Sequence, residues 1–121
     1  MRAMLLCALV VGCATHRIPE PLRGYEVLVE GRDEQSVELA RALRASGFRV
    51  RDHVRGGGRP TLAVIHFLFS DPGLDQPTWF HVRLADTRSG VIVGAGTVLL
   101  DSSVVTPRAR AKAAVQALSN P

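Results

Sequence analysis

One stretch, residues 61–70 (TLAVIHFLFS), constrains the fold more than any other, because only there are both alternating sets of side chains largely apolar. Successive side chains of a β-strand point to opposite faces of a sheet. One face of this strand would carry Ala63, Ile65, Phe67 and Phe69, and the other Leu62, Val64, His66 and Leu68. A strand that is apolar on both faces is typical of the middle of a sheet. We therefore expect residues 61–70 to form a central strand.

Length and composition limit the class of protein. The chain has 121 residues, 46% of them hydrophobic and 21% charged, which is ordinary for one globular domain. The formal net charge of +4 comes from arginine, because Lys112 is the only lysine. The basic residues are scattered along the chain rather than gathered in one run. This pattern argues against a nucleic-acid partner.

The N-terminus has the features of a bacterial export signal. Arg2 supplies a positive charge, and the apolar run at residues 3–11 is too short to span a bilayer as a helix. The sequence VVGC at residues 10–13 resembles the lipobox of bacterial lipoproteins. That resemblance implies cleavage before Cys13, a diacylglyceryl group on its sulfur and an acyl chain such as palmitate on its amino group. The alternative is a plain secretory signal with a coincidental cysteine.

The expected anchor defines the domain organisation. Residues 1–12 would be the signal peptide, residues 13–23 the lipidated cysteine and tether, and residues 24–121 a single folded domain. The mature domain would then contain no thiol and no disulfide. Position 14 is alanine rather than the aspartate that often retains lipoproteins in the inner membrane. By that resemblance, a periplasm-facing position on the outer membrane is favoured over the inner membrane.

Helix and strand signals alternate through the domain. One helix is expected between Asp33, a natural N-cap, and Gly47, a residue suited to the left-handed stop. A second helix would open at Thr106-Pro107 and run to about Leu118. Alternating side chains predict four further strands, at residues 25–29, 48–54, 79–86 and 91–100, the second of them at a sheet edge. The predicted fold is a two-layer α+β domain with a mixed sheet of about five strands (β-α-β-β-β-β-α) and two helices mainly on one face.

The strand register decides which side chains share a face. We expect Phe67 to lie opposite Phe80, His66 opposite His81 and, after the tight turn, Leu84 opposite Val93. In that register the second face carries six residues that we expect to form an interaction surface: Leu68, Trp79, His81, Arg83, Gly94 and Gly96.

That second face would be too apolar for bare solvent, and two short helices can cover only one face of the sheet. A partner protein, a second copy of the chain or the tether could cover it. If the helices instead straddle the sheet, the same face is simply core.

No pattern of residues indicates catalysis or a cofactor. His66 and His81 would be neighbours, yet two imidazoles are fewer ligands than a zinc site needs. Gly56-Gly57-Gly58 could cradle an anion, but it does not follow a strand and open a helix as a phosphate-binding loop does. No nucleophile elbow is present, and no thiol remains in the mature domain. We expect no metal, no cofactor and no enzymatic activity.

Three segments carry a family resemblance: ALRASGFRV, TLAVIHF and FHVRLADTRSGVIVGAGTV, the last followed by a terminal helix. Together they resemble a group of small bacterial envelope domains that includes the N-terminal domain of TolB, the penicillin-binding-protein activator LpoB and the curli lipoprotein CsgG. The chain departs from that pattern between its second and third strands, where those domains often have another helix. The resemblance implies a mixed sheet with helices and a role in binding envelope partners, and it transfers no catalytic residues.

These features together predict a non-enzymatic, lipid-anchored envelope protein that acts as a protein-binding accessory or assembly module. Its partners would be the membrane, through the lipid on Cys13, and another envelope protein or a second copy of the chain. The alternative is a periplasmic binder of a small ligand or cell-wall fragment that uses the same sheet face.

Overall fold

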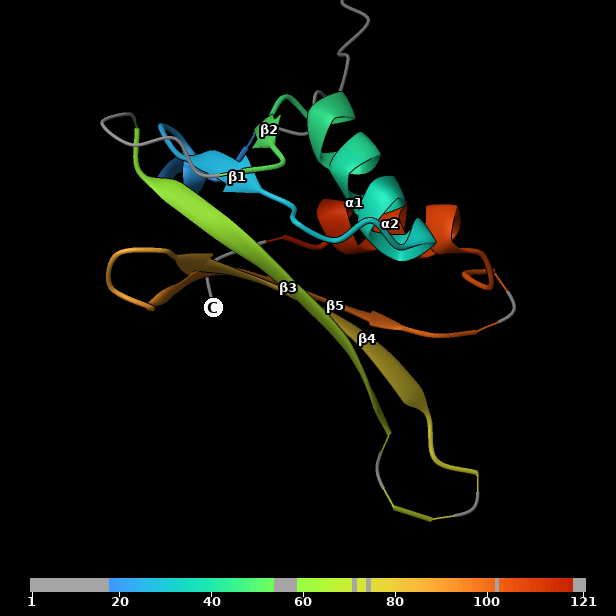
Figure 1. The fold of residues 1–121 in the computed structure, drawn as a ribbon. Helices are drawn as coiled ribbons and strands as arrows, with labels where there is room; N and C mark the ends of the chain where they lie inside the picture. Colours follow the sequence, from blue (N-terminus) through green and yellow to red (C-terminus); the bar gives the residue numbers. More distant parts are fainter. Residues whose placement is uncertain (1–17, 54–58, 71, 74, 102, 119–121) are drawn as a thin grey trace, which may run out of the picture.

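The computed structural model describes residues 18–53, 59–70, 72–73, 75–101 and 103–118 (Figure 1). The predicted signal peptide, Cys13 and the three glycines at residues 56–58 lie outside these ranges. In chain order the elements are the 3-10 helix η1 (Glu20–Leu22), β1 (Glu26–Leu28), α1 (Glu34–Ala45), β2 (Arg49–Arg51), β3 (Thr61–Ser70), β4 (Thr78–Asp86), β5 (Ile92–Leu99) and α2 (Pro107–Gln116). The predicted fold class, a five-strand mixed sheet with two helices in two layers, is confirmed.

The five strands form one sheet in the order β2-β1-β3-β4-β5. β1 pairs parallel with both β2 and β3, whereas β3, β4 and β5 form an antiparallel meander. The predictions of a central β3 and an edge β2 are both confirmed. The connection through α1 explains the parallel pairing of β1 with β2, because parallel neighbours need a crossover.

Local sequence signals begin and end the two helices as expected. Asp33 accepts a hydrogen bond from the Ser36 backbone N–H at 3.2 Å at the start of α1, and Gly47, with φ 95°, follows its end. Thr106 accepts from the Ala109 N–H at 3.1 Å in the same way at the start of α2. Among the described residues, no helix is long and apolar enough to cross a membrane.

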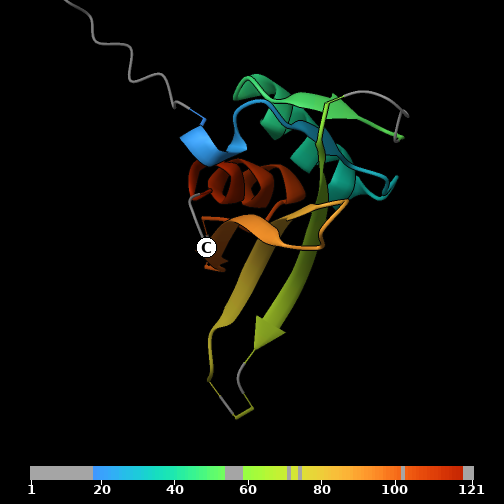
Figure 2. The ribbon, with the colours of Figure 1, turned by 90° about the vertical axis from the view of Figure 1, so that its left-hand side faces the viewer.

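Both helices lie on the same side of the sheet, and their N-terminal ends meet (Figures 1 and 2). The Gln35 side-chain amide donates to the Pro107 carbonyl at 2.9 Å. Between this helical layer and the sheet lies the core, which is built from the residues Val27, Leu39, Leu43, Leu62, Phe80, Val82, Leu84, Ala111 and Ala114, with Leu22 closing one end. Truncating any of its buried leucines to alanine would cost about 2–5 kcal/mol.

The β3–β4 register differs by one residue from the predicted one. Phe67 pairs with His81 and Leu68 with Phe80, so the expected pairing of Phe67 with Phe80 is wrong. A slip of one residue turns every side chain of a strand to the other face. The physical reason is that β3 is apolar on both faces, so its own pattern does not choose between them. Consequently Leu62 lies in the core and Ile65 faces away from the helices.

The β4–β5 register also differs, and a bulge causes the difference. Next to the turn, Ala85 pairs with Ile92, but a register shift then lets Leu84 pair with Gly94 rather than with Val93. Gly94 and Gly96 therefore face the helices, not the predicted interaction surface. A Cβ on Gly96 would lie 2.6 Å from the Ala114 carbonyl oxygen, so glycine at this position allows α2 to pack directly on β5.

Candidate functional site: the open face of the sheet

The face of the sheet opposite the helices carries a row of exposed apolar and aromatic side chains. Every second residue of β3 lies on this face, together with the residues of β4 that pair with them and the residues of β5 that pair with those of β4. We call this surface the open face and define it by Ile65, Phe67, Phe69, Trp79, His81, Arg83, Thr97 and Leu99. No helix among the described residues covers it, and Figure 2 shows the β3–β4 hairpin extending beyond the helical layer. Phe69 is 49% exposed, Ile65 46%, Leu99 43% and Phe67 36%.

Side chains on the open face contact one another in a defined arrangement. The Phe67 and His81 rings are stacked, with centroids 4.8 Å apart and planes at 11°. Phe69 meets the His81 ring edge-on at 6.3 Å, and the Thr97 hydroxyl lies 3.2 Å from Nδ1 of His81. The Arg83 guanidinium lies 5.3 Å from the Phe67 ring centroid, a cation–π arrangement. The result is a cluster of aromatic side chains with a cation at its border.

Arg83 is available to an anionic ligand. The ion pairs among the described residues involve Arg41, Arg51, His53 and His66, and none involves Arg83. A guanidinium held over an aromatic ring keeps its fork of N–H donors, which suits a carboxylate.

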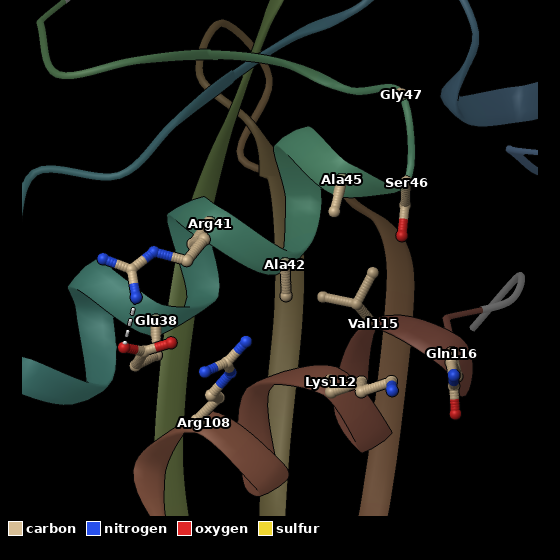
Figure 3. A pocket seen from close by; sticks show the side chains of 10 residues that line it. All are labelled: Glu38, Arg41, Ala42, Ala45, Ser46, Gly47, Arg108, Lys112, Val115 and Gln116. Carbon is tan, nitrogen blue, oxygen red and sulfur yellow. Dashed lines mark hydrogen bonds and ion pairs between the residues drawn. The ribbon is translucent and has the colours of Figure 1, made fainter.

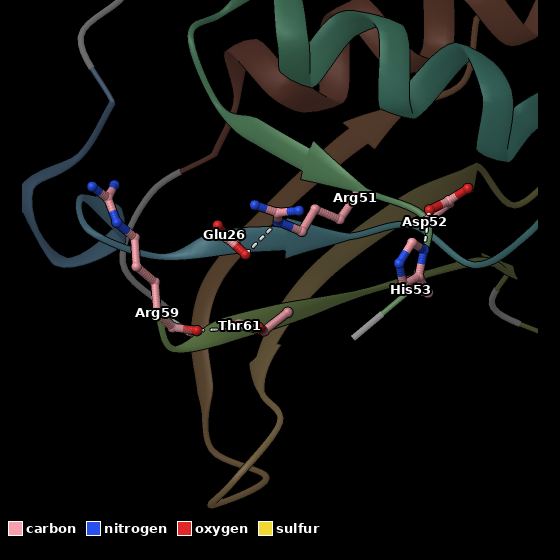
Figure 4. A network of polar contacts seen from close by, with 6 residues as sticks. All are labelled: Glu26, Arg51, Asp52, His53, Arg59 and Thr61. Atoms are coloured by element: carbon pink, nitrogen blue, oxygen red, sulfur yellow. Dashed lines mark hydrogen bonds and ion pairs between the residues drawn. The ribbon is translucent and has the colours of Figure 1, made fainter. Parts of the chain in front are cut away.

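A second cationic zone lies on the same side of the sheet, on β1 and β2. Glu26 accepts a hydrogen bond from Arg51 Nε at 2.5 Å, and this contact holds the pKa of the carboxyl below its ordinary value (Figure 4). Arg59 and Arg49 lower the same pKa further. Arg51 therefore pairs with this carboxylate, and Arg49 and Arg59 lie near enough to stabilise its negative charge.

Within the part of the chain that the structure describes, the outer edge of β3 has no strand partner over most of its length. β1 pairs only with Thr61–Ala63, and no strand among the described residues pairs with β3 on that side from Val64 to Ser70. Natural edge strands are usually protected by charged residues, proline or a bulge. Residues 64–70 contain no charged residue and no proline. The edge therefore offers unprotected backbone donors and acceptors.

The observed strand register places the six residues predicted for the interaction surface on two different faces of the sheet. Trp79, His81 and Arg83 lie on the open face, whereas Leu68, Gly94 and Gly96 point to the helical side. Leu68 is nevertheless 55% exposed, because β3 extends past the helices. The sequence prediction missed five members of the open face, namely Ile65, Phe67, Phe69, Thr97 and Leu99. The signal that could have found them is the run of aromatics at alternate positions of β3.

The two histidines lie on opposite faces, so the expected neighbourhood of His66 and His81 is wrong. His66 Nε2 lies 3.1 Å from the Ser36 hydroxyl, which donates to Asp33 at 2.6 Å. Asp33 Oδ2 approaches the same ring nitrogen at 3.9 Å, whereas a Ser-His-Asp triad needs its carboxylate on the other nitrogen. Ser36 is also only 3% exposed. This cluster ties the start of α1 to β3.

Ser36 also holds the pKa of Asp33 below its ordinary value through two hydrogen bonds.

No group of three or more potential metal ligands is present among the described residues. Comparison with known proteins found no matching family model, no matching curated protein and no matching solved structure.

Proposed function

We propose that this chain is a non-enzymatic, lipid-anchored envelope protein whose open face and bare β3 edge bind an extended segment of another envelope protein. The anchor rests on the export signal and on the resemblance of residues 10–13 to a lipobox. The binding role rests on one observation above all, the unprotected edge at residues 64–70 beside a row of exposed aromatics.

Strand addition is the recognition mode that uses both features. In this mode an added strand takes its affinity from backbone hydrogen bonds and its specificity from alternate side chains. An added strand would lie beside Ile65, Phe67 and Phe69 and would extend the open face. Arg83 supplies charge complementarity for an acidic side chain. The proposed partner segment is therefore extended, with apolar residues on one face and at least one carboxylate.

The orientation of the domain supports a partner located away from the bilayer. The start of the described chain and the β3–β4 turn lie at opposite ends of the molecule (Figures 1 and 2). A chain anchored through its N-terminus would therefore present the hairpin outward.

Backbone geometry allows a sharp test of the edge. The Thr61 carbonyl accepts from Thr87 N–H on the β4 side at 3.0 Å, and the Pro60 carbonyl accepts from Glu26 N–H on the β1 side at 2.9 Å. By alternation, the N–H of Leu68 points to the bare edge. Leu68→Pro removes that donor and leaves the β3–β4 bonds in place, because proline is tolerated where the N–H faces solvent. Leu68→Ala is the matched control.

The experiment is photo-crosslinking in cells from position 69, with position 37 on the opposite, helical layer as control. We expect an adduct from 69 that maps to an extended, acid-containing segment of an envelope protein. It should be lost in Leu68→Pro and kept in Leu68→Ala. The proposed partner would be contradicted if the adduct formed equally well in Leu68→Pro. It would also be contradicted if the adduct formed only with a second copy of the chain.

The second candidate function is binding of a cell-wall fragment. The exposed aromatic side chains of Phe67 and Phe69 favour it, because sugar rings pack on aromatic rings. Trp79, the only tryptophan, pairs with Phe69 on the same face and reports on it directly. Saturable quenching of its fluorescence by purified muropeptides, without any protein adduct, would favour this function.

A further inference from the structure

A groove of about 670 Å³ lies between α1 and α2, on the side of the molecule away from the open face (Figure 3). Because the helices run side by side in the same direction, the groove has two distinct ends. Arg41 and Arg108 line the end nearer the N-terminal ends of the helices, and Lys112 lies in the middle of α2 with its amine directed toward Val115 (Figure 3). Ala45, Ser46 and Val115 line the other end.

The groove as a whole has an excess of positive charge. Its one carboxylate, Glu38, lies 3.0 Å from Arg41. Arg108 and Lys112 take part in no ion pair among the described residues. Arg108 also lies in the first turn of α2, where the helix dipole favours an anion. Three cations with one carboxylate are suited to bind a phosphate group.

The end of the groove lined by Ala45, Ser46 and Val115 lies where the described chain begins. Ile18 Cδ1 would lie 3.6 Å from a Cβ placed on Gly47, which follows α1. A small depression lined by Ile18, Ser46 and Val115 joins this end to the start of the described chain. The cationic groove and the entry of the tether are therefore on one part of the surface.

We infer that this groove binds the phosphate group of anionic phospholipid headgroups and holds the helical layer against the bilayer. The inference rests on the anchored location in the proposed function, since the tether brings the groove to the lipid surface. Arg108 and Lys112 hold the phosphate, and the small apolar side chains of Ala42, Ala45 and Val115 leave room for the glycerol portion. The open face would then be directed away from the lipid.

Lys112 provides a direct test, because a chain with one lysine gives one lysine side-chain signal. The full chain is labelled with ¹³C at the lysine Cε and reconstituted through its own N-terminal segment into nanodiscs. The discs contain either neutral phosphatidylcholine alone or added phosphatidylglycerol. A third sample in neutral discs is titrated with soluble glycerol 3-phosphate.

The test compares two variants that change the net charge by the same amount. Arg108→Glu reverses a groove cation and keeps α2 stable, because an acidic residue suits a first helical turn. Arg44→Glu makes the same change on α1 at a residue that does not line the groove. In discs with phosphatidylglycerol we expect a shifted Lys112 signal that is lost in Arg108→Glu and retained in Arg44→Glu.

The other outcomes overturn the inference. A response to glycerol 3-phosphate but not to phosphatidylglycerol discs would make the groove a site for soluble phosphate compounds. An unchanged signal in all samples would mean that the groove binds no phosphate. Failure here is distinguishable from failure of the proposed function, because the crosslink from position 69 is read out on the opposite side of the molecule.

Discussion

The imidazole of His81 lies flat against the ring of Phe67, with centroids 4.8 Å apart, on a sheet face that no described helix covers. Stacked aromatic pairs in cores add to stability, but here Phe67 is 36% exposed and His81 is half-buried. The pair therefore contributes more to a surface for recognition than to the core. This relationship separates the residues that hold the fold together from those available to a partner.

Phe67→Ala should reduce binding while leaving the domain folded. Phe67 is exposed and its aromatic contacts are worth about 0.5–1.5 kcal/mol, so we expect a decrease of that size in the free energy of unfolding. Phe80 lies on the opposite face of the sheet, in the core, and its truncation to alanine should cost about 3–5 kcal/mol. Urea unfolding followed by circular dichroism measures both. Equal losses would contradict the assignment of the two faces.

The histidines should show opposite effects. His81→Ala removes part of the open face and its stack on Phe67, so the crosslink from position 69 should weaken and stability should fall by no more than the contribution of that contact, about 0.5–1.5 kcal/mol. His66→Ala releases Ser36 at the start of α1, so stability should fall while the crosslink persists. The two variants should be compared by thermal unfolding and by adduct yield. An activity that disappeared in either variant with folding intact would instead indicate an enzyme.

Gly96→Ala tests the corrected β4–β5 register. A methyl group there would lie 2.6 Å from the Ala114 carbonyl oxygen, which belongs to helix backbone and cannot move freely. We expect a loss of about 1–3 kcal/mol, as for other overpacked sites. Gly94→Ala should cost less, since its nearest neighbour at 3.0 Å is the flexible side chain of Leu22. No effect of Gly96→Ala on denaturant unfolding would place this residue on the surface.

The sequence predicted the elements well because their signals are local. Asp33 and Thr106 cap the helices through contacts within three residues, and both were identified from residue type alone. The composition of the open face depends instead on register, which β3 does not encode because both of its faces are apolar. The bulge at Leu84/Ala85 has no distinctive residue either. The packing of the helices onto the sheet, such as that of α2 on Gly96, decides which face is inside.

The exposed edge of β3 could not be predicted from local sequence signals either. An apolar ten-residue strand predicts a central position, and β3 does lie in the middle of the strand order. Its neighbour β1 has only three residues, however, and so pairs with only the start of β3. Strand length on the partner, rather than the pattern of β3 itself, therefore creates the exposed edge.

Acid should weaken the fold through Asp86, at the β4–β5 turn. Its carboxylate accepts from Arg88 N–H at 2.8 Å and from the Tyr25 hydroxyl at 2.9 Å, and these bonds lower its pKa. A carboxyl whose pKa is lower in the folded state adds stability above its unfolded pKa of about 3.9, and this contribution is lost as pH falls through the folded value.

Asp86→Asn should therefore be less stable than the wild type at neutral pH. The difference in the free energy of unfolding between the two proteins should disappear as the pH falls below about 4. The same hydrogen bond raises the pKa of Tyr25, so the stability that Tyr25 contributes is present below about pH 10 and declines above it. Urea unfolding of the wild type, Asp86→Asn and Tyr25→Phe from acid to alkaline pH measures both pH dependences. A constant gap between wild type and Asp86→Asn down to pH 2 would show that the charge of Asp86 does not stabilise the turn.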